Sequence, residues 1–446
     1  MKAYKFLLVF IVLVAASSCS KNKDIKLEGD KAVMDYVNFF MGEIYYWNTQ
    51  APKPDLNNYD NVFDFFSNSL VKQDRWSWME TGEDYMRQET GIYTSYGFNI
   101  RQNLEYYNDY ALSVAFVYPN SPFDKAGITR GCQILKINGE TTNDLIRAKR
   151  FNTEIDKSNN IFTIKDLTGN IKDISLSKSS IATRSVLISE VYTNKDFSGL
   201  SSAVGYINYL TFNANMMDDI NSAIAKMKAA NVKNLILDLR YNGGGDSRPT
   251  ALLANLLANK DCDGKVLVKR KHNSKYSSWD SDSKNIATIQ RTSESLDLAR
   301  LYIISGYGTA SASEVIINGL RPMMEVVMVG DTTYGKPNGM YVQTYPQSNY
   351  TNPDYVFLPI CFYNVNMNNE GDFDNGLIPN NYRPDDLYHN WGPEEDLIKS
   401  CLTHIVTGSF PPLPLAAHNN VKNLDNSYIL KIEENELSYG RYVVIP

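Results

Sequence analysis

The sequence predicts an α/β protein (α+β overall) of several domains, and three observations support this. Its 446 residues are too many for one ordinary hydrophobic core, so two or three domains are expected. From Val204 onward, apolar strands alternate with segments of helical periodicity, which is the pattern of an α/β core. Before this core, residues 92–182 are β-rich, and residues 20–91 carry apolar side chains at helical spacing.

The composition excludes several classes of function. The net charge is −6, with 44 basic and 50 acidic residues, so the chain has no basic footprint for nucleic acid. Its 4 histidines all lie outside the Gly-rich and Ser-rich turns. We expect neither a metal nor a cofactor. Four cysteines lack C-x-x-C spacing: Cys132, Cys262, Cys361 and Cys401. We favour free buried thiols at these positions, and two disulfides are the alternative.

Residues 1–19 have the features of a targeting segment. Lys2 and Lys5 precede an apolar run from Phe6 to Val14 that is too short to span a bilayer. The small residues ending at Cys19 resemble a bacterial lipoprotein signal, in which the cysteine becomes the first mature residue and carries the lipid. We therefore expect a protein anchored through Cys19 to the membrane of a bacterial cell envelope, with a plain secretory signal as the alternative.

Residues 20–91 predict a small helical domain. Apolar side chains between Tyr36 and Trp47 recur at helical spacing, and Pro52 ends this pattern. A second helix is predicted from Asn61 to Leu70, and the segment 74–78 closes the domain. The expected role of this domain is to pack against a neighbour.

Residues 92–182 contain a stretch that is similar to a PDZ domain. Between Ser121 and Leu145 the chain reads SPFDKAGITRGCQILKINGETTNDL, which resembles the S-P-A-x-x-A-G-(I/L)-x-x-G-D-x-I-x-x-I-N-G pattern of that family, with Cys132 where Asp is common. The resemblance implies a module that binds an extended peptide as an added strand and captures its C-terminal carboxylate in a loop. Gly97 and Phe98 are the candidates for this loop. A module that only supports the adjacent domain is the alternative.

Residues 183–410 carry the α/β core, and residues 411–446 are a tail. A loop with three glycines, Gly243–Gly245, follows a buried strand, so the backbone there can approach a ligand closely. No Gly-Lys-Ser/Thr follows, which argues against a phosphate loop. Strands are expected at 204–210, 235–239, 301–304, 326–329 and 355–362, helices at 216–230, 250–259 and 394–406, a polar connecting loop at 260–297, and a terminal hairpin at 427–446.

Two turns of this core carry the candidate chemistry. The strand 301–304 leads into a turn of small residues and then a helix, so Ser311 lies where unpaired N–H groups and the helix dipole favour an oxyanion. Lys336 follows the next strand, 25 residues later, and one helix and one strand would return the chain to Ser311. Because burial penalises the ammonium form, a neutral Lys336 can take the proton of Ser311 as a general base.

Three segments resemble the C-terminal processing proteases, also called tail-specific serine peptidases. They are the Asp238–Gly245 segment, the Ser-Ala-Ser-Glu turn that begins at Ser311, and the Tyr-Gly-Lys turn that ends at Lys336. The resemblance implies a crotonase-like ββα protease core and a serine endopeptidase that cleaves polypeptides at or near their C-termini. Ser311 matches the nucleophile of the family and Lys336 its base. The N–H groups of Ala312 and Gly244 would bind the oxyanion.

One position departs from the family pattern. The family commonly has a Gln four residues after the lysine to orient it, whereas this chain has Met340. Gln343, Asn338 and Glu314 are candidate replacements, together with Ser313, which is also a second candidate nucleophile. The alternative function is therefore a catalytically inactive lipoprotein that binds peptides through its PDZ-like module. A small-molecule acyl hydrolase or hydratase on the same core is a third possibility.

Overall fold

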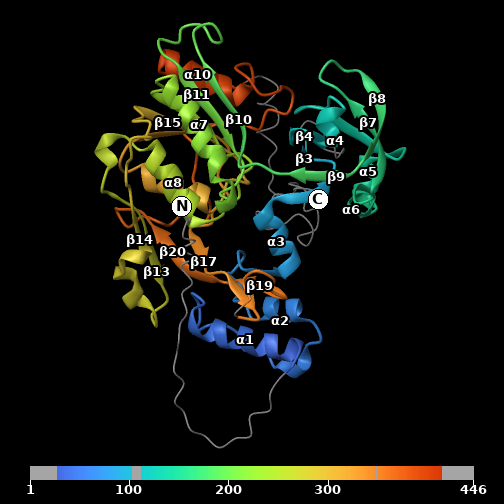
Figure 1. The fold of residues 1–446 in the computed structure, drawn as a ribbon, viewed down its shortest axis with the longest axis vertical. Coiled ribbons are helices and arrows are strands. Elements are labelled where there is room, and N and C mark those ends of the chain that lie inside the picture. The colour runs from blue at the N-terminus through green and yellow to red at the C-terminus, as the bar shows by residue number, and fades with distance from the viewer. Residues whose placement is uncertain (1–27, 103–111, 348, 414–446) are drawn as a thin grey trace, which may run out of the picture.

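The computed structural model describes residues 28–102, 112–347 and 349–413, and it has the mixed α/β architecture predicted from the sequence (Figure 1). The predicted signal, Cys19 and the predicted hairpin at 427–446 lie outside the described residues. Within the described ranges, no helix combines the length and hydrophobicity that a membrane crossing requires.

A six-stranded sheet forms the core of the C-terminal half. Its strands are, in spatial order, β10 (Val186–Tyr192), β11 (Val204–Tyr209), β12 (Asn234–Asp238), β15 (Arg300–Ser305), β16 (Glu325–Gly330) and β21 (Asn381–Tyr382). All neighbouring pairs are parallel except β10 with β11. Parallel strands are typically buried on both faces, which explains why they stand out in the sequence as apolar runs.

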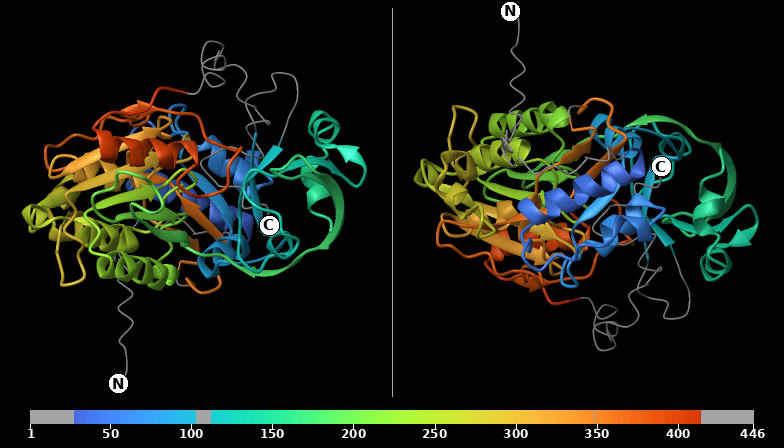
Figure 2. Two further views of the ribbon diagram at one scale, coloured as in Figure 1. Left: turned by 90° about the horizontal axis from the view of Figure 1, so that it is seen from above. Right: turned by 90° about the horizontal axis from the view of Figure 1, so that it is seen from below.

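Helices cover both faces of this sheet, as Figure 2 shows. Leu235 and Leu237 share one hydrophobic cluster with residues of the helices on one face, whereas Ile236 belongs to a second cluster with α10. This alternation follows from the two-residue period of a strand. The helices of the first face are α7 (Met217–Ala229), α8 (Ser247–Leu257) and α9 (Ala312–Leu320), and the opposite face carries α10 (Asp396–Thr407).

The segment 260–297, expected to be a polar loop, contains two strands. β13 (Val266–His272) pairs with β14 (Ile286–Thr288) on one side and with β20 (Ile360–Val365) on the other. The prediction was wrong because β13 reads VLVKRKH and lacks apolar alternation at its charged end. The second partner of β13, strand β20, is far away in the sequence, so the pairing leaves no local signal. β17 (Asn338–Met340) completes this four-stranded sheet beside β20.

The N-terminal helices share a core with strands from the C-terminal half. α1 (Asp30–Glu43) and α2 (Val62–Asn68) pack with Phe357, Ile360 and Phe362 in one hydrophobic cluster. β1 (Trp78–Thr81) pairs with β19 (Tyr355–Leu358), which also pairs with β18 (Gln343–Tyr345). The expected packing against a neighbour is present, and α3 (Gly82–Thr90) follows β1. The domain boundary at residue 91 stays a prediction.

A β-rich module stands to one side of the core (Figure 1). Its strands are β3 (Phe98–Gln102), β4 (Leu112–Val117), β5 (Gln133–Ile137), β7 (Asn159–Lys165) and β8 (Ile171–Ser177) in spatial order, with β6 (Glu140–Thr141) beside β5 and the short helices α4 (Pro122–Lys125), α5 (Thr142–Arg147) and α6 (Phe151–Ile155). The module has its own hydrophobic cluster. β2 (Ile92–Ser95) pairs with β9 (Ser179–Ala182), so the chain enters and leaves the module side by side. The boundaries at 92 and 182 and the likeness to PDZ domains remain predictions.

The four cysteines of the described core and module are free. Each is buried and none is paired: Cys132, Cys262, Cys361 and Cys401. The favoured interpretation from the sequence is therefore confirmed.

Candidate active site

Ser311 lies at the first turn of α9 in an uncommon backbone conformation. Its φ is 55° and its ψ is −113°, a region that non-glycine residues rarely adopt and that costs roughly 1–3 kcal/mol. The next residue, Ala312, is the first of the helix, where an N–H has no acceptor within the helix itself. The surrounding structure must hold this strained turn in place.

Asn242 holds the Ser311 turn against the glycine loop. Its carbonyl oxygen accepts the N–H of Ala310 at 3.1 Å and the hydroxyl of Ser313 at 3.0 Å. Its side-chain nitrogen donates to the carbonyl of Tyr209 at 2.9 Å. Ser313 is buried, and this hydrogen bond assigns its hydroxyl to the backbone of Asn242. Asn242 was not among the predicted site residues, although it lies within the motif that points to the family.

Gly244 lies directly against the Ser311 turn. Its φ is 104°, and a Cβ at this position would lie 2.8 Å from Ser311 Cβ and 2.9 Å from the nitrogen of Ala312. Only glycine fits this space without displacement. The Gly244 N–H, the predicted oxyanion donor, donates at 2.9 Å to the side-chain oxygen of Asn242. An oxyanion would have to share or replace this bond, so the role of Gly244 stays a prediction.

Glu314 joins the serine turn to the lysine turn. One oxygen of its carboxylate, Oε2, accepts the N–H of Ser311 and the N–H of Lys336, both at 2.8 Å. The other oxygen accepts the N–H of Gly335 at 2.8 Å and the hydroxyl of Thr333 at 2.6 Å. Glu314 is fully buried. Burial raises the pKa of its carboxyl above the ordinary value, and the four hydrogen bonds oppose that shift.

The backbones of Ser311 and Lys336 therefore lie close together, because both N–H groups donate to the same oxygen of Glu314. Glu314 was predicted as a group that helps to hold the lysine, and in the structure it accepts the backbone N–H of Lys336. Glu314 is the third residue of α9, where a carboxylate reaches back to the N–H of the residue that begins the helix. The same carboxylate also accepts the N–H of Lys336, which lies 22 residues further along the chain in a second turn.

The side chain of Lys336 is half-buried between a sulfur atom and an aromatic ring. Its Nζ lies 3.7 Å from Sδ of Met340 and 4.7 Å from the ring centre of Trp78. Met340 thus contacts the lysine from the position where the family commonly has Gln. Trp78 comes from the N-terminal region and was not predicted as a site residue.

Of the other candidates for orienting the lysine, Gln343 has different partners. Oε1 of Gln343 accepts the hydroxyl of Tyr36 at 3.3 Å, and its Nε2 donates to the carbonyl of Val342 at 3.1 Å. Both polar atoms of this amide are therefore engaged elsewhere. Asn338 is fully buried on β17, opposite Tyr363 of β20.

A buried charge network connects the β-rich module to the glycine loop. Arg130 of the module donates to the hydroxyl of Tyr241 at 2.5 Å and to Asp385 at 2.7 Å. Arg240 donates to Asp385 at 2.8 Å and to Glu395 at 2.5 Å. Burial opposes the charge of Asp385, but the two guanidinium groups outweigh it and lower the pKa of this carboxyl. Arg240 and Tyr241 immediately precede the Asn-Gly-Gly-Gly loop.

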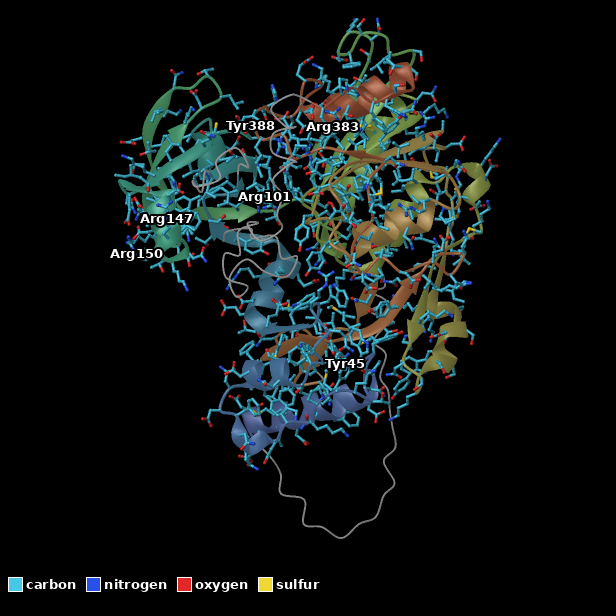
Figure 3. The ribbon with its side chains drawn as sticks, turned by 180° about the vertical axis from the view of Figure 1, so that it is seen from behind. Tyr45, Arg101, Arg147, Arg150, Arg383 and Tyr388 are labelled. Atoms are coloured by element: carbon cyan, nitrogen blue, oxygen red, sulfur yellow. The ribbon has the colours of Figure 1, made fainter. Side chains whose placement is uncertain are left out.

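The predicted carboxylate loop of the module lies at the start of β3. The Gly97 N–H donates to the hydroxyl of Ser95 at 3.1 Å, and the Phe98 ring stacks on Phe123 with centres 3.9 Å apart. Arg101 of the same strand lies over the ring of Tyr241, 5.0 Å from its centre. Figure 3 shows Arg101 on the side of the module that faces the core, with Arg147 and Arg150 further away. The binding role of Gly97 and Phe98 stays a prediction.

Comparison with known proteins gives consistent matches. Residues 203–357 match Peptidase family S41, and residues 32–78 match the Peptidase S41 N-terminal domain. The carboxy-terminal processing protease CtpA of Bacillus subtilis is 28% identical over 224 residues, which is 48% of this chain and 42% of that protein. The chloroplastic carboxyl-terminal-processing peptidase 2 of Arabidopsis thaliana is 31% identical over 139 residues, 30% of this chain and 24% of that protein.

The chain thus spans less than half the length of these curated relatives. Among solved structures, a putative S41 protease from Bacteroides fragilis superposes with a TM-score of 0.69 at 22% identity, covering 84% of this chain and 97% of that one. Trp78, Gly244, Ser311 and Lys336 all lie in the two regions of this chain that are similar to the S41 peptidase family.

Proposed function

We propose that this chain is a serine endopeptidase that cleaves polypeptides at or near their C-termini, with Ser311 as the nucleophile and Lys336 as the general base. The proposal rests above all on Glu314, since one of its oxygens accepts the N–H groups of both residues at 2.8 Å. It is also supported by the similarity to proteins named carboxy-terminal processing proteases.

The reaction would proceed in two steps. Ser311 Oγ attacks the scissile carbonyl and passes its proton to the neutral amine of Lys336, which then protonates the leaving amine. Water activated by Lys336 hydrolyses the acyl-enzyme. The oxyanion would take hydrogen bonds from the N–H groups of Ala312 and Gly244, and the loss of one such donor typically costs ~3 kcal/mol of transition-state stabilisation.

Substrate tails would bind to the β-rich module. An extended peptide adds a strand, and its carboxylate lies near Gly97 and Phe98. The contact between Arg130 and Tyr241 gives this module a direct connection to the strand that ends in the glycine loop. A lipid on Cys19 would keep the enzyme at the membrane of the cell envelope.

Labelling with a fluorophosphonate probe tests this proposal. We expect the wild-type chain to be labelled covalently, peptide mass spectrometry to locate the adduct on Ser311, and Ser311→Ala to lower the labelling rate by at least about 100-fold. Ser222→Ala, on the exposed side of α7, is the control and should label like the wild type. An unlabelled wild type, or an adduct on Ser313, would contradict the assignment, and the former favours the inactive peptide-binding alternative.

The variant Gly244→Ala tests whether the close contact of Gly244 with the Ser311 turn is needed for activity, beyond the general cost of alanine at a positive φ. We expect kcat/KM for an unstructured protein substrate to fall by about 10²- to 10³-fold, because the new Cβ displaces the Ser311 turn and the Ala312 N–H. Gly264→Ala is the matched control, since Gly264 also has a positive φ (73°) but a Cβ there would meet nothing within 4 Å. It should cost about 1 kcal/mol of stability and leave activity unchanged. Equal activity of the two variants would argue against a role of Gly244.

A further inference from the structure

A segment of the N-terminal region, residues 74–78, lies on the turn that carries Lys336. We call it the Trp loop, and its sequence is Asp-Arg-Trp-Ser-Trp. It ends the region that matches the S41 N-terminal domain. Neither the family match nor the proposed reaction gives it a role.

Arg75 and Trp76 of the Trp loop bind the backbone of the lysine turn. Nη2 of Arg75 donates to the carbonyls of Tyr334 at 3.2 Å, Gly335 at 3.0 Å and Asp374 at 2.6 Å. Nε1 of Trp76 donates to the same Gly335 carbonyl at 3.0 Å. Since the Gly335 N–H is bound by Glu314, both polar groups of the residue that precedes Lys336 are held.

The Trp loop is itself fixed by the N-terminal core. Oδ1 of Asp74 accepts the N–H groups of Trp76 and Ser77, both at 2.9 Å. Its Oδ2 accepts the hydroxyl of the fully buried Tyr45 at 2.7 Å and that of Ser77 at 2.5 Å. Figure 3 shows Tyr45 within the layer of N-terminal helices. The lysine turn is thus connected to α1 and its core through a short chain of hydrogen bonds.

Trp78 contacts the reacting group itself, with its ring 4.7 Å from Nζ of Lys336. An aromatic face attracts an ammonium group, typically by about 0.5–1 kcal/mol at exposed sites. Nε1 of Trp78 donates at 3.0 Å to Glu80, a buried acidic group on β1. The charged groups beside the turn also include Glu314, which binds the Lys336 N–H, and the guanidinium of Arg75.

We propose that the Trp loop is the positioning element of Lys336: Arg75 and Trp76 fix the backbone of the turn, and the face of Trp78, together with Met340, holds the amino group. This inference rests on the proposed function. It assigns to the N-terminal region the task that the family resemblance implies for a Gln within the peptidase domain. The S41 N-terminal region is then part of the active site, because the aromatic ring touches the reacting amine.

Two substitutions of Trp78 test the proposal through the pH profile of kcat/KM. Trp78→Phe keeps an aromatic face, whereas Trp78→Leu keeps only apolar bulk, and both lose the bond to Glu80. The aromatic face attracts the ammonium form of the lysine, so Trp78→Leu should shift the acidic limb of the kcat/KM profile to lower pH. It should also lower kcat by about tenfold or more with little change in KM, because the amine is no longer held in line. Trp78→Phe should keep the wild-type profile and most of kcat.

One further variant controls for folding, and another tests the contacts of Arg75. Trp47→Leu removes a tryptophan that stacks on Trp76 in the same core, so it should lower stability without moving the pH profile. Arg75→Lys keeps the charge but cannot reach three carbonyls, and it should slow fluorophosphonate labelling of Ser311 by about tenfold. If the Phe and Leu variants have the same profile and kcat, or if Arg75→Lys labels at the wild-type rate, the Trp loop has no positioning role.

Different experimental outcomes would contradict this inference and the proposed function. If wild-type protein is inactive and unlabelled while Ser311→Ala behaves identically, the proposed function itself is wrong. If the wild type is active and depends on Ser311 and Lys336, unchanged Trp78 variants overturn the positioning role alone.

Discussion

Lys336→Ala is expected to lower kcat/KM for an unstructured protein substrate by about 10⁴- to 10⁶-fold, because the serine hydroxyl then has no base. The fold should persist. The side chain is half-buried, and its loss removes the contacts of Nζ with Trp78 and Met340, which typically costs about 1 kcal/mol. Initial rates of proteolysis and thermal unfolding by circular dichroism measure the two effects separately.

The double variant gives the sharper form of this prediction. Residues that act as one catalytic unit are strongly non-additive, so Ser311→Ala combined with Lys336→Ala should be no slower than Ser311→Ala alone. Lys399→Ala is the matched control, because Lys399 is exposed on α10 and pairs with Glu394 at the surface. Its activity should stay within about twofold of the wild type. If Lys336→Ala keeps about a tenth of the activity, another group is the base.

The α/β core could be predicted because its signals are local in the sequence. Buried parallel strands appear as apolar runs, and α7 has Ile220, Ile224 and Met227 on one buried face. The Ser311 turn and the glycine loop are also contiguous segments, so their residues were identified together with the elements that carry them. Lys336 was identified because one helix and one strand return the chain to the same sheet edge.

The contacts that support Lys336 could not be predicted in this way. Arg75 and Gly335 are separated by 260 positions in the sequence, and the Trp loop reaches the lysine turn through long-range packing and through the antiparallel pairing of β1 with β19. β1 shows no pattern that specifies its partner strand. Gln343 was a reasonable candidate by spacing, but it lies in β18, where its amide faces Tyr36. Burial and pairing, rather than spacing, decide which polar group reaches the lysine.

Asn242 illustrates a second limit of the sequence. Its position between a buried strand and three glycines indicates a turn, and asparagine is common in turns for local reasons. Its actual partners come from elsewhere: the carbonyl of Tyr209, the N–H of Ala310 and the hydroxyl of Ser313. These bonds exist only once β11, β12 and α9 have assembled. A residue that links three elements has the same sequence signature as one that merely forms a turn.

Glu314→Gln is expected to be the most damaging isosteric substitution in the site. The carboxylate accepts four hydrogen bonds, whereas an amide has one oxygen and presents an NH₂ group to the remaining donors. The amide nitrogen must face either the N–H pair of Ser311 and Lys336 or the N–H of Gly335. We expect the free energy of unfolding to fall by roughly 2–4 kcal/mol and the labelling rate of Ser311 to fall by about tenfold or more.

The stability that Glu314→Gln loses should depend on pH, and the direction of this dependence follows from the pKa of Glu314. Burial raises the pKa of the Glu314 carboxyl in the folded state, so the folded chain binds this proton more tightly than the unfolded chain does. The contribution is fully present below the ordinary glutamate pKa and is lost as the pH rises through the raised value. Glutamine does not titrate, so the stability difference between wild type and variant should be larger in acid than at neutral pH. Urea unfolding at both pH values measures it, and a difference that shrinks in acid would contradict this account.

Two controls separate the link between the turns from simple stability. Glu325→Gln alters an exposed carboxylate that pairs with Arg300 and should change stability by no more than about 0.5 kcal/mol. Thr333→Val removes a donor to Oε1 of Glu314 but leaves untouched the oxygen that binds both Ser311 and Lys336. It should cost about 1–2 kcal/mol of stability and change the labelling rate of Ser311 by less than about threefold. If Thr333→Val slows labelling as much as Glu314→Gln does, then the stability of the region, and not the shared oxygen, keeps the serine and the lysine together.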